Sequence, residues 1–383
     1  MKTIALLLLA LAPVLPQDPP TVPKSPAAAV EPYVDRHVLA GAVALVATKD
    51  KILSHEAVGF MDVKARTPMR PDAVFWIASQ SKSITATAVM MLVDEGKIAL
   101  DDPVEKYLPE FKGQMVVAEQ DADHVVLKKP VHPITLRNVL SHTSGMKFSS
   151  PMEQPTLDGL TLKDAVRSYA MMPLQWEPES KYQYSNAGIN TAARVLEVVS
   201  KMKYEDFMQK RLFDPLGMKD TTFWPNEEQT KRLAKSYKPG KDKMGLVETT
   251  VGQLRYPLND HAKRYPMPAG GLFSTASDVG KFCRMILNGG TLDGKRYLTE
   301  KAVKEMTSKQ TGDLKEGYGL GWSTGGGNPG HGGAYATNMS IDPKRGLVFV
   351  WMVQVAGGYP GEGGKSQGAF RKAADEEFGK STK

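Results

Sequence analysis

Hydrophobic positions along this chain follow two periods, one typical of strands and one typical of helices. Apolar, β-rich runs at residues 41–47 and 52–60 are parted by a polar turn, which predicts an antiparallel hairpin. Near the other end, residues 347–353 show no polar alternation, so we expect a strand that is buried on both faces. Strands are therefore predicted at both ends of the chain.

Between these ends, apolar residues recur with the period of a helix. The clearest case is residues 79–95, where the helical spacing continues up to a stop at Gly96. Ser277 would cap a helix that ends near residue 287. Other helices are predicted at residues 28–39, 133–146, 186–200, 205–213, 299–308 and 368–378, and other strands at 318–323, 334–341 and 347–355.

This order of elements implies that the two ends of the chain share one sheet. We predict an α/β fold of the α+β type, in which residues 28–77 and 266–383 form the sheet domain. Residues 78–265 would form an inserted, mainly helical domain, although 225–265 look polar and irregular. A chain of 383 residues suits one large domain or two coupled domains.

The first residues have the pattern of a secretory signal. Lys2 is followed by an apolar run at 4–11 and by small residues, so we expect residues 1–17 to be a signal peptide and the proline-rich residues 18–27 to be a linker. The apolar run is too short to span a membrane, and no cysteine follows it. We expect an exported protein, periplasmic or extracellular, without a stable membrane anchor.

The composition excludes several classes of function. Lys and Arg residues give a net charge of +7 but never form a run longer than two, so no nucleic-acid partner is expected. The single cysteine, Cys283, lies in an apolar helical pattern typical of a buried thiol. The seven histidines form neither H-x-H nor H-E-x-x-H, and His142 is interpreted as a structural residue, so we predict no metal and no cofactor.

Candidate chemistry begins at three serines that are followed by a lysine three residues later. Only Ser79 combines a preceding β-type run with a long apolar helix. Positions i and i+3 share one face of a helix, so Lys82 would approach the Ser79 hydroxyl. A serine needs a neighbouring base before it can attack a substrate, although a serine at this place can also be a helix cap. The other pairs are Ser144 with Lys147 and Ser200 with Lys203.

A second candidate is Tyr184-Ser185-Asn186, the only Y-x-N in the chain. A lysine ammonium nearby would lower the pKa of a tyrosine hydroxyl and let it act as a base. The asparagine amide would hold the substrate and the lysine. Taken alone, the same residues also fit a loop tyrosine that precedes a helix cap.

A third candidate is His331-Gly332-Gly333, placed just before the strand that is expected from Ala334. Glycines let a strand edge approach a ligand closely, and a backbone N–H there can point at a carbonyl oxygen. Taken alone, these residues also fit a plain glycine-rich turn.

In this order, the three motifs resemble the serine β-lactamase and penicillin-binding superfamily, whose pattern is S-x-x-K, then Y-x-N or S-D-N, then K-T-G or a variant. Within that superfamily, the chain resembles the group of class C β-lactamases, D-Ala-D-Ala carboxypeptidases and family VIII carboxylesterases. The resemblance implies an antiparallel sheet with helices on both faces, a helical domain and a site in the cleft. Further similar stretches are residues 134–145, 214–218, 268–278 and 318–322.

The resemblance also implies a role for each matching residue. Ser79 would be the acylated nucleophile, and Lys82 would help to deprotonate it. Tyr184 would be the general base and proton shuttle. The substrate-binding residues would be Asn186, His331 and Gly333, and the N–H groups of Ser79 and Ala334 would form the oxyanion hole.

The third motif departs from the family pattern. His331 replaces the lysine of K-T-G and Gly332 its hydroxyl residue, a pair that ordinarily helps to bind a substrate carboxylate. An unperturbed histidine is mostly neutral at pH 7. We therefore predict a secreted serine hydrolase that acts on esters or small amides through an acyl-enzyme, with β-lactams or D-Ala-D-Ala peptides as the alternative. The partner would be a small-molecule or peptide substrate, and the oligomeric state stays open.

Two other classes of function fit the sequence less well. Residues 321–325 match the G-x-S-x-G of α/β-hydrolases, but glycines and a strand follow Ser323 and no carboxylate lies between it and His331, the last histidine. A non-catalytic peptidoglycan- or β-lactam-binding module would not need Lys82 and Tyr184.

Overall fold

The computed structural model describes residues 25–379 of the chain. The predicted signal peptide and most of the predicted linker therefore lie outside the described residues. The described chain begins with the 3₁₀ turn η1 (Pro26–Val30) and helix α1 (Glu31–Asp35), where a single helix was predicted. None of the helices within residues 25–379 has the length and apolar character needed to cross a membrane.

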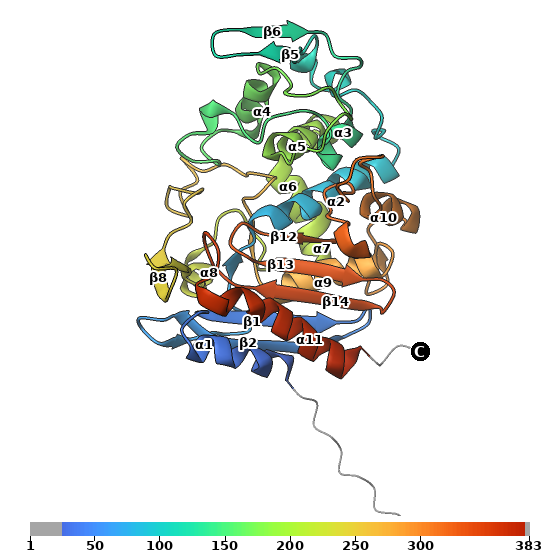
Figure 1. Cartoon of the computed structure of the whole chain (residues 1–383). Coiled ribbons are helices and arrows are strands. Elements are labelled where there is room, and N and C mark those ends of the chain that lie inside the picture. Colours follow the sequence, from blue (N-terminus) through green and yellow to red (C-terminus); the bar gives the residue numbers. More distant parts are fainter. Residues whose placement is uncertain (1–24, 380–383) are drawn as a thin grey trace, which may run out of the picture.

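An antiparallel sheet of six strands forms the lower half of the molecule in Figure 1, in the order β12-β13-β14-β1-β2-β3. Strand β1 (Gly41–Ala47) pairs with β2 (Ile52–Asp62), which confirms the predicted hairpin. On its other side β1 pairs with β14 (Leu347–Met352), and β2 also pairs with the short β3 (Thr67–Pro68). The prediction that both ends of the chain build one sheet is therefore confirmed.

The two central strands contribute alternate residues to two hydrophobic cores. Val350 faces the larger core together with α9 (Ala276–Leu287), whereas Trp351 faces a second core together with α11 (Ser366–Phe378). Every residue of β14 is buried, as its uninterrupted apolar sequence predicted. Burying one side chain of this kind contributes roughly 1.5–3 kcal/mol, so the strand anchors the sheet from both faces. Figure 1 shows α11 crossing the front of the sheet.

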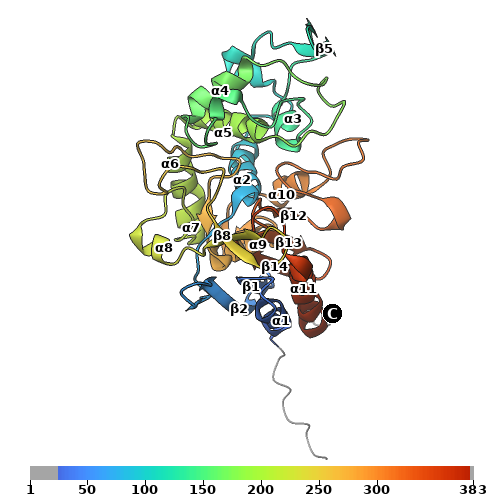
Figure 2. The ribbon, with the colours of Figure 1, turned by 60° about the vertical axis from the view of Figure 1, so that its left-hand side comes forward.

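Helix α2 (Ser81–Asp94) lies between the sheet and the helices α3 (Leu136–Ser141), α4 (Leu162–Ala170) and α5 (Asn186–Ser200) in both ribbon views (Figures 1 and 2). Its residues 81–92 are all buried. A helix that is covered on every side belongs in the interior of a protein. The predicted helix over 79–95 is confirmed except for its first turn, which is the 3₁₀ turn η2 (Ala78–Gln80).

The remaining helices and short hairpins surround this core. Residues 225–265, expected to be irregular, contain a short helix and a hairpin. The elements are α6 (Tyr204–Met208), continued by a π-helical turn at Gln209–Phe213, α7 (Asp214–Leu216), α8 (Glu227–Lys231), α10 (Glu300–Thr307), and the pairs β4 (Phe75–Trp76) with β9 (Phe273–Ser274), β5 (Val116–Gln120) with β6 (Val125–Lys128), β7 (Ser236–Pro239) with β8 (Leu246–Thr249), and β10 (Thr291–Leu292) with β11 (Lys295–Arg296).

Local predictions near the C-terminal strands are wrong in detail. Residues 318–323 form no strand and are joined only by isolated bridges. The strand expected from residue 334 begins later, as β13 (Asn338–Asp342), and His331 lies in a separate edge strand, β12 (Gly330–Gly332). The reason is a tight turn, closed by a 2.7 Å hydrogen bond from the N–H of Gly333 to the carbonyl oxygen of Thr337.

The N-cap of α9 is Thr275, not Ser277 as predicted. Thr275 has an extended backbone, and its hydroxyl accepts the N–H of Asp278 at 3.3 Å. This is the geometry that a capping side chain requires. The helix therefore begins two residues earlier than its sequence suggested, and Cys283 lies buried within it, as predicted.

Candidate active site

Ser79 lies where strand β4 passes into helix α2. The pairing of β4 with β9 and a 3.0 Å hydrogen bond from the N–H of Ile77 to the carbonyl oxygen of Leu272 fix the chain just before it. The Ser79 hydroxyl is partly exposed, and its Oγ lies 3.1 Å from Nζ of Lys82. The structure thus brings together the two residues of the first motif.

Lys82 is fully buried and makes three hydrogen bonds, none of them to a carboxylate. Its Nζ lies 3.1 Å from Oγ of Ser79, 2.7 Å from Oδ1 of Asn186 and 2.8 Å from the carbonyl oxygen of Ala269. Burial lowers the pKa of Lys82 well below its ordinary value. A neutral amine has two hydrogens and one lone pair. The two carbonyl oxygens can accept the hydrogens, which leaves the lone pair for the proton of Ser79.

Tyr184 lies over this lysine from the segment that precedes α5. Nζ of Lys82 is 4.6 Å from the centroid of the Tyr184 ring. Burial raises the pKa of Tyr184, and the Ser79 side chain offsets only part of that effect. The predicted lowering of this pKa by a lysine ammonium is therefore wrong, because burial dominates. Tyr184 is protonated in this site.

His331 approaches Tyr184 from the edge strand β12, with 6.1 Å between the two ring centroids. Both of its ring nitrogens are engaged. Nδ1 lies 2.7 Å from the carbonyl oxygen of Gly332, which can only accept, so Nδ1 carries the proton. Nε2 then accepts the hydroxyl of Tyr318 at 2.9 Å. Burial, with a smaller effect from Lys82, lowers the pKa of His331 to about 3, so the side chain is neutral.

The turn between β12 and β13 packs closely against Ser79. A Cβ atom on Gly333 would lie 2.6 Å from the carbonyl oxygen of Ile77, so only glycine fits there. The following residue, Ala334, is exposed, and its N–H has no hydrogen-bond partner within residues 25–379. The N–H of Ser79 lies in the first turn of a helix, where N–H groups have no intrahelical partner. Both N–H groups are therefore available to a ligand.

Two contacts of the site had no role in the sequence analysis. The carbonyl oxygen of Ala269 accepts a hydrogen bond from Lys82, and the hydroxyl of Tyr318 bonds His331. Both residues lie in stretches that resemble the family, 268–278 and 318–322. That resemblance marked the stretches, but only the folded chain shows which atoms of them reach the site.

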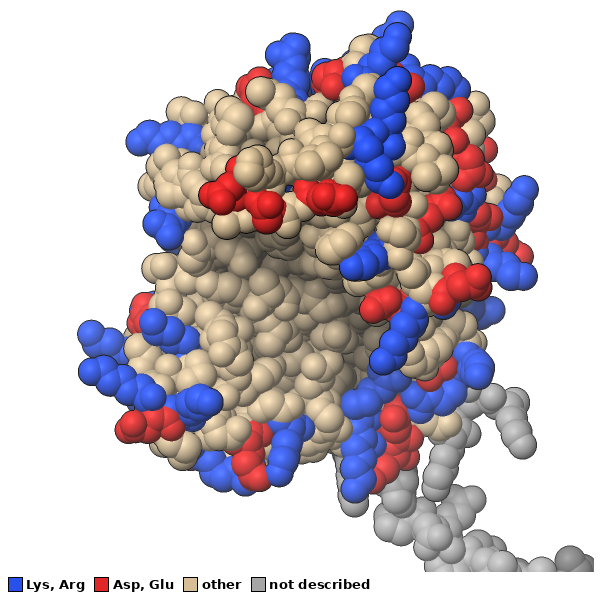
Figure 3. All heavy atoms as spheres, turned by 45° about the horizontal axis from the view of Figure 1, so that its top comes forward, with Lys and Arg blue, Asp and Glu red and all other residues tan. Residues whose placement is uncertain are grey.

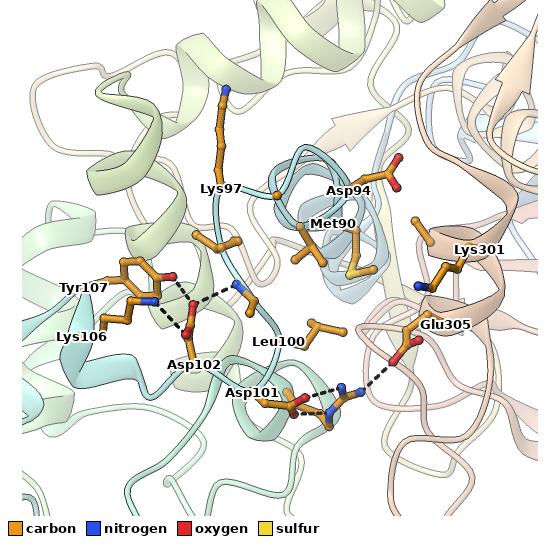
Figure 4. Close-up of a pocket in the computed structure, with 16 residues that line it drawn as sticks. Met90, Asp94, Lys97, Leu100, Asp101, Asp102, Lys106, Tyr107, Lys301 and Glu305 are labelled. Atoms are coloured by element: carbon orange, nitrogen blue, oxygen red, sulfur yellow. Dashed lines mark hydrogen bonds and ion pairs between the residues drawn. The ribbon is translucent and has the colours of Figure 1, made fainter.

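A cavity of about 620 Å³ lies elsewhere, at the C-terminal end of α2 (Figure 4). Several of its charged side chains pair with one another. Arg137 bonds Asp101 and Glu305, and Lys106 bonds Asp102. None of the candidate site residues lines this cavity. Over residues 25–379, no cluster of three or more His, Cys, Asp or Glu side chains is arranged to hold a metal ion.

Comparisons with known proteins show which family the chain belongs to. A family model described as Beta-lactamase matches residues 27–372. Esterase EstB from Burkholderia gladioli is 29% identical over 376 residues, which cover 88% of this chain and 90% of EstB. Penicillin-binding protein 4 from Amycolatopsis lactamdurans is 29% identical over 328 residues, which cover 82% of this chain and 80% of that protein.

Solved structures agree on the fold. The structure of EstCE1, described as a hydrolase with promiscuous acyltransferase activity, matches with a TM-score of 0.75 at 24% identity and covers 91% of this chain and 97% of EstCE1. The predicted α/β fold, an antiparallel sheet with flanking helices, is confirmed by this likeness. Because the family model extends over nearly all the described residues, the chain belongs to the β-lactamase family and is a serine hydrolase of the β-lactamase and penicillin-binding type.

Proposed function

We propose that this protein is an exported serine hydrolase that cleaves uncharged esters or small amides through an acyl-enzyme at Ser79. The observation that carries the substrate class is the neutral, fully engaged His331 at the position where the family pattern has a lysine. A site without that cation has lost one partner for a substrate carboxylate. Export is supported by the signal-like pattern of residues 1–17.

In the proposed acylation, Oγ of Ser79 attacks the carbonyl carbon of the substrate. Its proton passes to the neutral amine of Lys82, 3.1 Å away. The negative charge that develops on the substrate oxygen is bound by the N–H groups of Ser79 and Ala334. Each such donor typically contributes on the order of 100-fold or more in rate.

Tyr184 completes the proton path. Its protonated hydroxyl donates a proton to the leaving-group oxygen and recovers one from Lys82. The products of this half-reaction are an alcohol and the Ser79 ester. In deacylation, water attacks that ester, and its proton returns through Tyr184 and Lys82 while Oγ of Ser79 leaves as the hydroxyl.

One face of the molecule carries a hollow whose floor has few charged side chains (Figure 3). Figure 3 shows a broad hollow on one face, with Lys, Arg, Asp and Glu side chains along its rims and other residues across its floor. The relative named Esterase EstB favours ester hydrolysis at 29% identity. Penicillin-binding protein 4, at the same identity, keeps β-lactam or D-Ala-D-Ala peptide hydrolysis as the second candidate.

A panel of substrates tests the proposal. Short p-nitrophenyl esters, nitrocefin and a D-Ala-D-Ala peptide are offered at equal concentration to the purified protein and to Ser79→Ala. We expect ester turnover to be fastest and to vanish in Ser79→Ala. Faster turnover of nitrocefin or of the peptide than of every ester would overturn the substrate class. Failure of a fluorophosphonate probe to label Ser79 would overturn the acyl-enzyme itself and favour a non-catalytic binding module.

A further inference from the structure

His142 makes two hydrogen bonds to the backbone on either side of Tyr184. Its carbonyl oxygen accepts the N–H of Gln183 at 2.8 Å, and its Nδ1 accepts the N–H of Ser185 at 3.2 Å. Its ring also packs on Tyr184, with 4.6 Å between the centroids. One residue from another part of the fold therefore fixes the backbone before and after the tyrosine, and contacts its side chain.

The backbone of His142 is held in an unusual conformation. His142 is the C-cap of α3 and has φ 62° and ψ 31°, in the left-handed region. Residues other than glycine rarely adopt this region, although Asn, Asp and His do so more readily than others. The conformation aims both the carbonyl oxygen and the ring at residues 183–185.

The contact at Ser185 fixes the tautomer of the ring. A backbone N–H can only donate, so Nδ1 of His142 is the acceptor and the proton lies on Nε2. That Nε2 is buried and has no hydrogen-bond partner within the described residues. The His142 ring packs on the ring of Tyr318, with 4.6 Å between the two centroids. An unpaired buried donor destabilises the folded protein. An apolar side chain would fill this space without that cost, so filling space does not explain a histidine here.

We propose that His142 is a positioning residue that holds the Tyr184 hydroxyl against Ser79, acting through the hydrogen bonds to Gln183 and Ser185. This inference rests on the role of Tyr184 in the proposed function. His142 touches neither Ser79 nor the reacting atoms by any hydrogen bond within residues 25–379, so it acts on the reaction only through the tyrosine.

Two substitutions separate the hydrogen bond from the bulk of the ring. In His142→Asn, the amide oxygen lies where Nδ1 was, and asparagine tolerates the left-handed backbone. In His142→Leu, much of the volume stays but the acceptor is lost. Thermal unfolding of both variants shows whether they are folded at the assay temperature.

With the ester that the wild type cleaves fastest, we expect His142→Leu to lower kcat by roughly 10- to 100-fold, the range typical of a catalytic group displaced by about 1 Å. KM should change little, because no substrate contact is removed. His142→Asn should restore most of kcat. Loss of KM instead of kcat, or equal loss of kcat in both variants, would overturn the inference.

The decisive measurement is a double-variant cycle with Tyr184→Phe. If His142 acts through the Tyr184 hydroxyl, adding His142→Leu to Tyr184→Phe should change kcat by less than about twofold, the usual tolerance of such cycles. The same fold-loss in both backgrounds would overturn the inference. Absence of turnover in the wild type would overturn the proposed function and this inference together. Wild-type turnover that His142→Leu leaves unchanged would overturn this inference alone.

Discussion

Replacing His331 by glutamine should make the folded protein less sensitive to acid. His331 is buried and neutral, with Nε2 accepting the Tyr318 hydroxyl at 2.9 Å. A glutamine amide oxygen can take the place of Nε2 and accept the same hydroxyl, but it does not titrate. The variant therefore keeps the contact and removes the proton-binding site.

The magnitude follows from the two pKa values of His331, its ordinary 6.5 when unfolded and about 3 when folded. As the pH falls, the unfolded chain binds a proton before the folded protein does, so stability is full above pH 6.5 and is lost on the way down to about 3. A pH of about 4.5 lies about 2 units below the pKa of the unfolded state. Over this range the unfolding free energy falls by roughly 3 kcal/mol.

Urea unfolding followed by tryptophan fluorescence, at about pH 7.5 and about pH 4.5, gives the change in unfolding free energy for each protein. The wild type should lose roughly 3 kcal/mol more than His331→Gln on acidification. His55, whose pKa burial also lowers, is present in both proteins and cancels in the difference. His124→Gln, at an exposed histidine, should behave like the wild type. Equal losses in wild type and His331→Gln would refute the assignment of His331 as a buried neutral residue.

Three further predictions concern catalysis. Ser79→Ala should abolish ester turnover, since loss of a nucleophile typically lowers kcat by a factor on the order of 10⁶. Ser323→Ala should leave the rate unchanged. Loss of turnover in Ser323→Ala but not in Ser79→Ala would favour the α/β-hydrolase alternative. Tyr184→Phe should lower kcat by roughly 100- to 10,000-fold, as removal of a proton-transfer group does, and an unaltered kcat would exclude Tyr184 from the reaction. Gly333→Ala places a methyl group 2.6 Å from the carbonyl oxygen of Ile77 and should displace the neighbouring oxyanion donor. We expect kcat to fall about 100-fold in a variant that thermal unfolding shows to be folded. A wild-type kcat would contradict the close approach.

Sequence patterns predicted those parts of the fold whose causes are local. Helix α5 (Asn186–Ser200) has the predicted bounds, because its apolar face lies within the segment and its N-cap, Ser185, directly precedes it. Strand β14 was predicted from its uninterrupted apolar run. The hydrogen bond between Lys82 and Ser79 was likewise expected, since it depends only on helical spacing.

Features that depend on distant segments could not be predicted in the same way. The turn after Gly332 is set by packing of residue 333 against Ile77, which the sequence does not reveal. The pKa of Tyr184 moves opposite to expectation because burial is a property of the whole fold. The bond between His142 and Ser185 joins residues more than forty positions apart. Such contacts carry no periodic signal.

The pairing of β1 with β14 constrains when this chain can fold during synthesis. Ala44, near the start, is the register partner of Trp351, near the end. Contacts between residues so distant in sequence form slowly, because a long loop must close first. Until nearly the whole chain has been made, the apolar β1 lacks one neighbour, and the turn with Ala334, the proposed second oxyanion donor, does not exist. A chain that already carries Ser79, Lys82 and Tyr184 would therefore remain inactive until its last strands join the sheet.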